Sequence, residues 1–186
     1  WLADFTAALT SQDVDAAVAL FGADSYWRDL VSFTWNISTQ EGPEAIRAML
    51  QARLADTRPS AFVVEGQATE AGGVIDAWFT FETAVARGRG HLRLKDGKAW
   101  TLLTTMTELK GFEELKGERR IKGAEHGVHP GRKTWLEQRQ DEAAALGRTV
   151  QPYVVIIGGG QGGIALGARL RRLGVSAIIV EKNEKP

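Results

Sequence analysis

The sequence predicts an α+β domain, in which helices pack on a curved antiparallel sheet, followed by the start of a parallel α/β domain. Three observations lead to this fold class. Apolar residues recur at helical spacing in residues 2–21 and again after Gly42. The period of the apolar pattern changes to two between Ala61 and Leu109. Near the end of the chain, a run of β-branched residues leads into a glycine-rich turn.

The first elements are predicted to be helices. Residues 2–21 should form two of them, because Thr10-Ser11-Gln12-Asp13 has capping chemistry and interrupts the apolar stripe. We expect Gly22 to end the second helix and residues 25–33 to be extended. A further helix is expected from Pro43 to about Asp56, since proline is well tolerated at the first helical position.

Four successive antiparallel strands are predicted next, at residues 61–70, 74–85, 88–95 and 98–109. Asp96-Gly97 is a strong hairpin signal between the last two. In the second strand, Phe79 and Phe81 fall on one face, and Trp78 falls on the other face together with acidic residues. A mixed aromatic and charged face is typical of partner-binding surfaces, so we expect a homodimer through this sheet.

Composition excludes several classes of function. The 186 residues include 23 basic and 23 acidic ones, and this balance offers no electrostatic basis for nucleic-acid binding. The absence of cysteine excludes disulfides, thiolate metal sites and cysteine nucleophiles, and the three histidines are too scattered for a zinc motif, so no metal site is predicted. No apolar run reaches the roughly 20 residues of a membrane span. We therefore expect a cytoplasmic protein. Because the chain begins with Trp1 and stops just after a strand-like run, we expect it to be a piece of a longer protein.

A connector is predicted between the two domains, which gives the boundaries 1–110, 111–151 and 152–186. Its sequence is charged and punctuated by glycine, and Thr134 is placed to cap a short helix ending at Gly147. Because a free linker carries fewer large apolar residues, we expect the connector to pack through Leu115, Trp135 and Leu146.

The chemistry of the sequence is concentrated after Tyr153. A β-branched run, typical of a buried parallel strand, leads directly into Gly158-x-Gly160-x-x-Gly163. In this pattern the first glycine allows a tight turn, the second allows the backbone to approach a pyrophosphate, and the third allows close packing of helix and strand. The N-terminus of the following helix offers free N–H groups and a positive dipole end to the phosphates.

The elements after the glycines complete the pattern. Residues 164–173 are predicted to be helical, with Ile164, Leu166, Leu170 and Leu173 facing inward, and residues 175–180 form a second buried strand. Glu181 stands at the carboxyl end of that strand, close to the distance of roughly 20 residues expected for the acid that binds a ribose hydroxyl. The order of strand, glycines, helix, strand and acid favours dinucleotide binding over a purely structural turn.

Two parts of the sequence resemble known families. Residues 1–110 resemble the nuclear-transport-factor-2-like (SnoaL-like) cone fold in element order, in Trp1-Leu-Ala-Asp-Phe and in Gly42-Pro-Glu-Ala-Ile. Residues 154–175, followed by Ile178-Ile-Val-Glu-Lys, resemble the Rossmann-type FAD-binding start of flavin-containing monooxygenases. Together with the connector sequence Glu125-His-Gly…Pro130-Gly-Arg-Lys-Thr-Trp, the chain resembles flavin monooxygenase-like oxidoreductases that carry an N-terminal cone domain.

This resemblance implies a set of cofactor-binding residues. Gly158, Gly160 and Gly163 would hold the pyrophosphate of FAD, with Gly162 in the same loop, and Glu181 would hold the adenosine ribose. The implied activity is an NADPH-using monooxygenase that transfers one oxygen atom to a small organic substrate. We expect this piece alone to be inactive.

The resemblance leaves two alternatives open, because the family's NADPH-binding glycine motif and its monooxygenase fingerprint do not occur in this sequence. The first is another FAD- or NAD-dependent dehydrogenase or reductase. The second is a non-enzymatic module, in which the cone domain alone binds a small ligand or forms a dimer.

No catalytic side chain is identified. Asp29 and Asp76 are candidate acid–base groups in a cone pocket, but a solvated or hydrogen-bonded carboxylate on a strand is the expected role of each. We expect His91 on the wet face of its strand and both His126 and His129 in an exposed loop. Four tryptophans should mostly line the cone or its sheet: Trp27, Trp35, Trp78 and Trp100.

Overall fold

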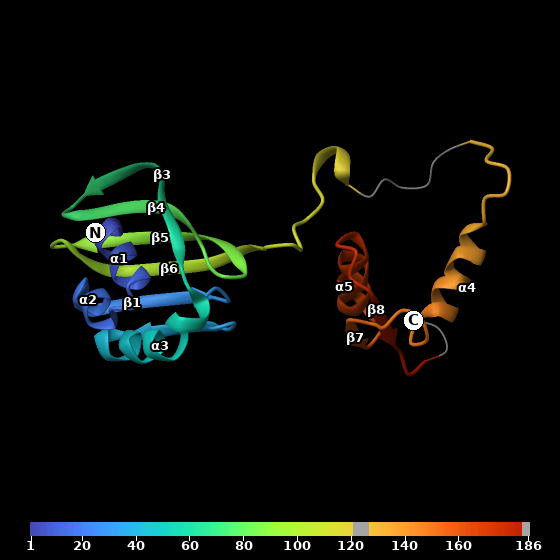
Figure 1. Cartoon of the computed structure of the whole chain (residues 1–186), viewed down its shortest axis with the longest axis horizontal. Coiled ribbons are helices and arrows are strands. Elements are labelled where there is room, and N and C mark those ends of the chain that lie inside the picture. Colours follow the sequence, from blue (N-terminus) through green and yellow to red (C-terminus); the bar gives the residue numbers. More distant parts are fainter. Residues whose placement is uncertain (121–126, 184–186) are drawn as a thin grey trace. The chain divides into compact units, whose positions relative to one another are not determined.

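The computed structural model describes residues 1–120 and 127–183. The chain divides into two compact units, Trp1–Phe112 and Glu113–Pro186. In Figure 1 the first unit runs from blue to green and the second from yellow to red.

The first unit consists of helices packed on one six-stranded sheet (Figure 1). Its helices are α1 (Leu2–Thr10), α2 (Val14–Ala19) and α3 (Gly42–Thr57). Its strands are β1 (Phe21–Leu30), β2 (Ile37–Glu41), β3 (Ser60–Ala71), β4 (Val74–Glu82), β5 (Ala86–Lys95) and β6 (Lys98–Leu109). The strand order is β2-β1-β6-β5-β4-β3. The three predicted helices and four predicted strands are confirmed, with shifts of a few residues.

Two expectations for this unit are wrong, and one strand was missed. Gly22 does not end a helix but lies in β1, which begins one residue earlier at Phe21. The ring of Phe21 packs in the core, 5.9 Å from the ring of Phe5. The sheet is not purely antiparallel, since β1 pairs with β6 in parallel. Strand β2 was not predicted, because its polar sequence has no apolar alternation; its place depends on pairing with β1, in which Leu30 lies opposite Ile37.

Aromatic side chains fill the inside of the cone. Trp27, Phe33, Phe79 and Phe81 are all buried and form a contiguous cluster with α1 and α3. Two glycines of β5 make room for the rings: a Cβ at Gly88 would lie 2.3 Å from the ring of Phe81, and one at Gly90 would lie 2.1 Å from the ring of Phe79. The rings therefore lie against bare backbone, and the interior is a packed core.

The second unit contains a strand–helix–strand segment. Its described elements are η1 (Gly117–Arg119), α4 (Trp135–Ala145), β7 (Val154–Ile157), α5 (Gln161–Arg172) and β8 (Ala177–Val180). β7 and β8 are parallel neighbours, with Ile156 opposite Ile179. The predicted strand, helix and strand are confirmed as elements, although α5 begins three residues earlier than expected.

The face that α5 turns toward the strands differs from the prediction. Ile164 and Leu166 are exposed, whereas Gly163 and Gly167 lie on the inner face, together with Leu170 and Leu173. A Cβ at Gly167 would come within 2.9 Å of Ile179 Cδ1. In its first two turns the helix therefore approaches the strands along its glycines, which are spaced at the helical period, and the predicted inward positions of Leu170 and Leu173 are confirmed.

The connector packs less than its composition suggests. The predicted cap is confirmed, because Thr134 and Glu137 form a reciprocal capping box at the start of α4. Trp135, however, is 66% exposed, and α4 has no buried residue. The expectation that Trp135 anchors the connector is wrong; its indole lies instead beside Arg139, 5.3 Å from the guanidinium carbon.

Candidate functional site

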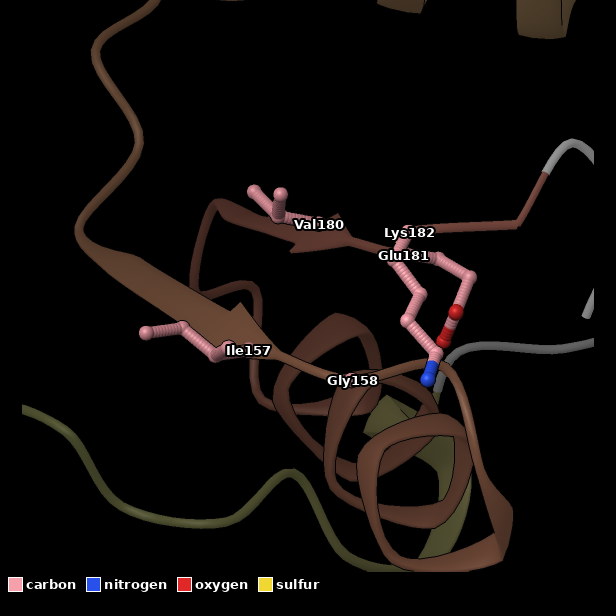
Figure 2. Close-up of a pocket in the computed structure, with 5 residues that line it drawn as sticks. All are labelled: Ile157, Gly158, Val180, Glu181 and Lys182. Atoms are coloured by element: carbon pink, nitrogen blue, oxygen red, sulfur yellow. The ribbon is translucent and has the colours of Figure 1, made fainter.

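A hollow of about 310 Å³ lies at the carboxyl ends of β7 and β8 (Figure 2). It is lined by Ile157, Gly158, Val180, Glu181 and Lys182. Figure 2 shows the side chains of Glu181 and Lys182 reaching the glycine-rich turn from the end of β8. The carboxyl ends of parallel strands are where open α/β sheets bind their ligands.

Two glycines of the turn are explained by the chain itself. Gly158 has a φ of +101°, a backbone conformation that other residues rarely adopt. Gly163 has no room for a side chain, because a Cβ there would lie 2.0 Å from the carbonyl oxygen of Gly158. Gly158 is therefore needed for the turn and Gly163 for close packing of α5, as the sequence pattern predicted.

Two other glycines are not explained by the described chain. Gly160 has a φ of −70°, which any residue adopts, and Gly162 lies in the first turn of α5. At both positions a Cβ would meet nothing within 4 Å. Neither backbone conformation nor packing requires glycine there, whereas a ligand that approaches the backbone closely would require it.

The N-terminus of α5 is open to an anion. Gly160 is its N-cap residue, no side chain caps it, and no acidic residue lies in the first turn. The first N–H groups of a helix lack intrahelical partners and carry the positive end of the dipole. Basic residues gather at the opposite end, in the last turn. The helix therefore presents unoccupied donors and partial positive charge beside the glycine-rich turn, which suits a phosphate.

Glu181 is held in place beside this turn. Its Oε2 accepts a hydrogen bond from the backbone N–H of Gly159 at 2.7 Å, and its Oε1 accepts one from the N–H of Asn183 at 3.1 Å. These backbone donors, that of Gly159 first, lower the pKa of Glu181 below the ordinary carboxyl value. The carboxylate is therefore ionised at neutral pH, and each oxygen keeps a lone pair for a further donor.

The other carboxylate candidates are structural or superficial. Asp29 is fully buried and accepts hydrogen bonds from the backbone N–H groups of Ser32, Phe33 and Thr34. The hydroxyls of Thr34 and Thr104 donate to it as well. The interpretation of Asp29 as a hydrogen-bonded carboxylate is confirmed, and its lone pairs are occupied by the fold.

Asp76 belongs to a cluster on the outer face of the sheet. Its Oδ1 lies 2.7 Å from His91 Nε2, and its Oδ2 lies 3.7 Å from Arg93 Nε. The ring of His91 lies 4.4 Å from that of Trp78, and the guanidinium carbon of Arg89 lies 4.2 Å from the Trp78 ring centre. The predicted position of His91, on the face opposite Leu92, is confirmed.

The two remaining histidine candidates add no described residue to the hollow at β7 and β8. His129 is exposed, and His126 lies outside the described residues. Among the described residues, no group of three His, Cys, Asp or Glu side chains is arranged to hold a metal ion. In the same part of the chain, no helix is both long and apolar enough to cross a membrane.

Sequence reasoning missed a smaller hollow on the first unit. It measures about 180 Å³ and lies between the β1–β2 loop, the last turn of α3 and the β4–β5 turn. Trp35, which was expected to line the cone, is 60% exposed at this hollow. The loop between β1 and β2 turns the indole outward. The sequence offers only a weak sign of this, the position of the tryptophan between two polar residues.

The first unit, with its helices packed on one six-stranded sheet, is an α+β domain. Residues 2–102 match the model of the SnoaL-like domain family. The chain belongs to the SnoaL-like domain family. A comparison with curated proteins finds no match.

Comparison with solved structures finds matches at low sequence identity. A nuclear-transport-factor-2-like protein of unknown function from Cytophaga hutchinsonii is 17% identical, with a TM-score of 0.39 over 56% of this chain and 85% of its own. A domain of unknown function with a cystatin-like fold from Nostoc punctiforme is 13% identical, with a TM-score of 0.48 over 56% and 72%. The orange carotenoid protein of Anabaena, which binds canthaxanthin, is 16% identical, with a TM-score of 0.43 over 55% and 34%.

Proposed function

We propose that the second unit binds the adenosine diphosphate part of FAD, and that the chain is the N-terminal part of a flavin-dependent oxidoreductase. One observation carries this proposal. Gly160 and Gly162 leave open backbone at the uncapped N-terminus of α5, although nothing in the described chain requires glycine at either position. Close approach of a pyrophosphate supplies the missing reason.

The residues present fit such a cofactor. The backbone N–H groups at the start of α5 would hold the pyrophosphate, and the ionised carboxylate of Glu181 would accept hydrogen bonds from the hydroxyls of the adenosine ribose. A 2′-phosphate on that ribose would be repelled by the same carboxylate. This charge favours FAD over a phosphorylated dinucleotide at this turn.

Bound flavin would supply the redox chemistry. The resemblance of this segment to flavin-containing monooxygenases favours NADPH as the reductant and a small organic molecule as the substrate that receives oxygen. The chain's own contribution is to bind and orient the cofactor through Gly158, Gly160, Gly162, Gly163 and Glu181.

Flavin content tests this proposal. We expect the complete gene product to purify with bound FAD, and Gly160→Val to abolish retention because a branched side chain occupies the place of the pyrophosphate. Glu181→Ala should weaken FAD affinity by roughly 10- to 100-fold, the usual effect of losing a charge-assisted hydrogen bond. The measurement is the ratio of flavin to protein absorbance after dialysis.

A matched control separates cofactor binding from folding. Glu142, on α4, pairs with Arg171 of α5 at 3.3 Å and lies outside the hollow, so Glu142→Ala should leave flavin content unchanged. Unchanged flavin content in both Gly160→Val and Glu181→Ala would place the cofactor elsewhere and overturn the proposal.

The outer face of the sheet supports a second candidate function, self-association of the cone. Trp78 is 38% exposed and lies among the charged side chains of Arg89 and Asp76, with Val63 exposed nearby on β3. Aromatic and arginine side chains are enriched in the centres of protein interfaces. We expect Trp78→Glu to shift sedimentation toward monomer, whereas Trp135→Glu, on α4, should not. A wild-type protein that stays monomeric at high concentration would contradict this candidate.

A further inference from the structure

We propose that the first unit carries a binding site for small aromatic acids in the hollow beside the β1–β2 loop, separate from the glycine-rich turn. The hollow is lined by Ser32, Phe33, Trp35, Arg53, Asp56, Thr57, Thr83 and Val85. Three segments that are distant in sequence meet there: the loop at 31–36, the last turn of α3 and the turn between β4 and β5.

The loop between β1 and β2 keeps Trp35 exposed, and its backbone adopts unfavourable φ angles to do so. Val31 has a φ of +59° and Trp35 a φ of +56°, a left-handed region that is unfavourable for side chains with a Cβ and especially for β-branched valine. The Trp35 indole nevertheless remains 60% exposed to solvent. Backbone strain of this kind is typical of ligand contacts, and neither burial nor packing of the indole compensates for it here.

The buried carboxylate of Asp29 stabilises the strained loop. Three successive backbone N–H groups, those of Ser32, Phe33 and Thr34, donate to it, and Thr104 Oγ1 on β6 donates to it at 2.8 Å. Thr104 Oγ1 also accepts the indole N–H of buried Trp27 at 2.9 Å. The loop is thereby tied to the sheet core, so the position of Trp35 is set before any ligand arrives, which lowers the entropic cost of binding.

The charged groups of the hollow are Arg53 and Asp56, in the last two turns of α3. Among the described residues, neither forms an ion pair or another side-chain hydrogen bond. An unpaired guanidinium is a strong bidentate donor for a carboxylate, and an unpaired carboxylate accepts a hydrogen bond from a hydroxyl or amino group. The two charges together select a ligand that carries both an acid group and a donor.

The threonine hydroxyls that line the hollow already have hydrogen-bond partners within the chain. The hydroxyl of Thr57 donates to the carbonyl of Arg53, and the hydroxyl of Thr83 accepts the N–H of Ala86. With about 180 Å³, the hollow is smaller than the roughly 300–1,000 Å³ of sites for drug-sized molecules. It therefore suits a single aromatic ring that stacks on Trp35, with a carboxylate at Arg53 and a hydroxyl or amino group at Asp56.

Calorimetric titration of the 186-residue protein with 4-hydroxybenzoate tests the proposal. We expect saturable binding that Arg53→Gln weakens by roughly 10- to 100-fold and Trp35→Ala by roughly 2- to 10-fold. Asp56→Asn should weaken the affinity for 4-hydroxybenzoate but not that for benzoate. The matched control is Trp135→Ala with Arg139→Gln, which removes an equally exposed tryptophan and its arginine on α4 and should leave binding unchanged.

Three results would overturn the proposal. The first is an absence of binding at millimolar 4-hydroxybenzoate. The second is binding that Arg53→Gln and Trp35→Ala both leave unaltered. The third is equal affinity for phenol, which lacks the carboxylate that the guanidinium should recognise. None of these results depends on flavin binding, because the residues concerned lie in the first unit.

Discussion

The two units of the chain use their apolar residues differently. In the first unit, rings such as those of Phe5, Trp27 and Phe81 are completely or almost completely buried. In the described part of the second unit, Ile156 is the one buried apolar side chain, whereas Tyr153 and Ile157 are 84% and 89% exposed. The first unit therefore encloses a core of its own. The second unit forms a glycine-rich turn on a two-stranded parallel sheet that α5 contacts and that leaves Val155 and Ile157 exposed, although such sheets are stable only when both faces are covered.

The difference predicts that the units fold unequally when they are separated. Residues 1–112 alone should unfold in one cooperative thermal transition, because their core is complete. Residues 113–186 alone should show no cooperative transition, since an isolated parallel strand pair buries too little apolar surface. Circular dichroism during heating measures both. Non-cooperative unfolding of residues 1–112, or cooperative unfolding of residues 113–186, would contradict this difference between the units.

Substitution of one glycine in each unit should affect stability differently. Gly90→Val should cost about 1–3 kcal/mol or more, because its side chain meets the ring of Phe79 with no space between. Gly160→Val should cost less, about 1 kcal/mol at most, because its side chain points into open space and only the preference for glycine at the N-cap of α5 is lost. Urea denaturation of the 186-residue protein, followed by the amide NMR signals of each unit, distinguishes a glycine needed for packing from a glycine kept for a ligand. Equal losses in the two variants would show that Gly160 also has a packing role.

Asp29 provides a test of the polar part of the first core. Asp29→Asn replaces an oxygen acceptor by an amide donor in front of backbone N–H groups, and should cost roughly 2–3 kcal/mol. Asp24, on the same strand, is exposed, so Asp24→Asn should change stability by less than about 0.5 kcal/mol. Denaturant midpoints of the two variants give the measurement, and indistinguishable midpoints would contradict a structural role of the Asp29 carboxylate.

The smallest expected effect is the pH dependence of the Glu181 contacts. Because hydrogen bonds from backbone N–H groups lower the pKa of Glu181 in the folded state, its contribution is fully present above the unfolded-state value near 4.5 and is lost as the pH falls through the lower folded-state pKa. The amide proton of Gly159 should report this change in an NMR titration from pH 6 downward. Glu181→Gln should remove the titration. A Gly159 shift that persists in this variant would assign the change to another group.

The sequence predicted those features that depend on neighbouring residues. Thr134 capped its helix as expected, Asp96-Gly97 closed its hairpin, and Gly158 and Gly163 took the roles that their spacing indicated. Caps, hairpin turns and glycine turns are determined by a few consecutive residues, so the chain encodes them locally. For the same reason the positions of the three helices and four of the strands of the first unit were predictable.

Only the tertiary structure decided the features that depend on distant residues. Strand β2 exists because β1 pairs with it, and β1 lies parallel to β6 although Trp27 and Leu102 are 75 residues apart in the sequence. Trp35 is exposed in a loop whose backbone N–H groups at Phe33 and Thr34 donate to the buried carboxylate of Asp29. Local sequence was enough to locate the glycine-rich turn and every helix and strand of the first unit other than β2. Strand partners and side-chain exposure were decided by the fold, because pairing and burial depend on contacts that no short stretch of sequence contains.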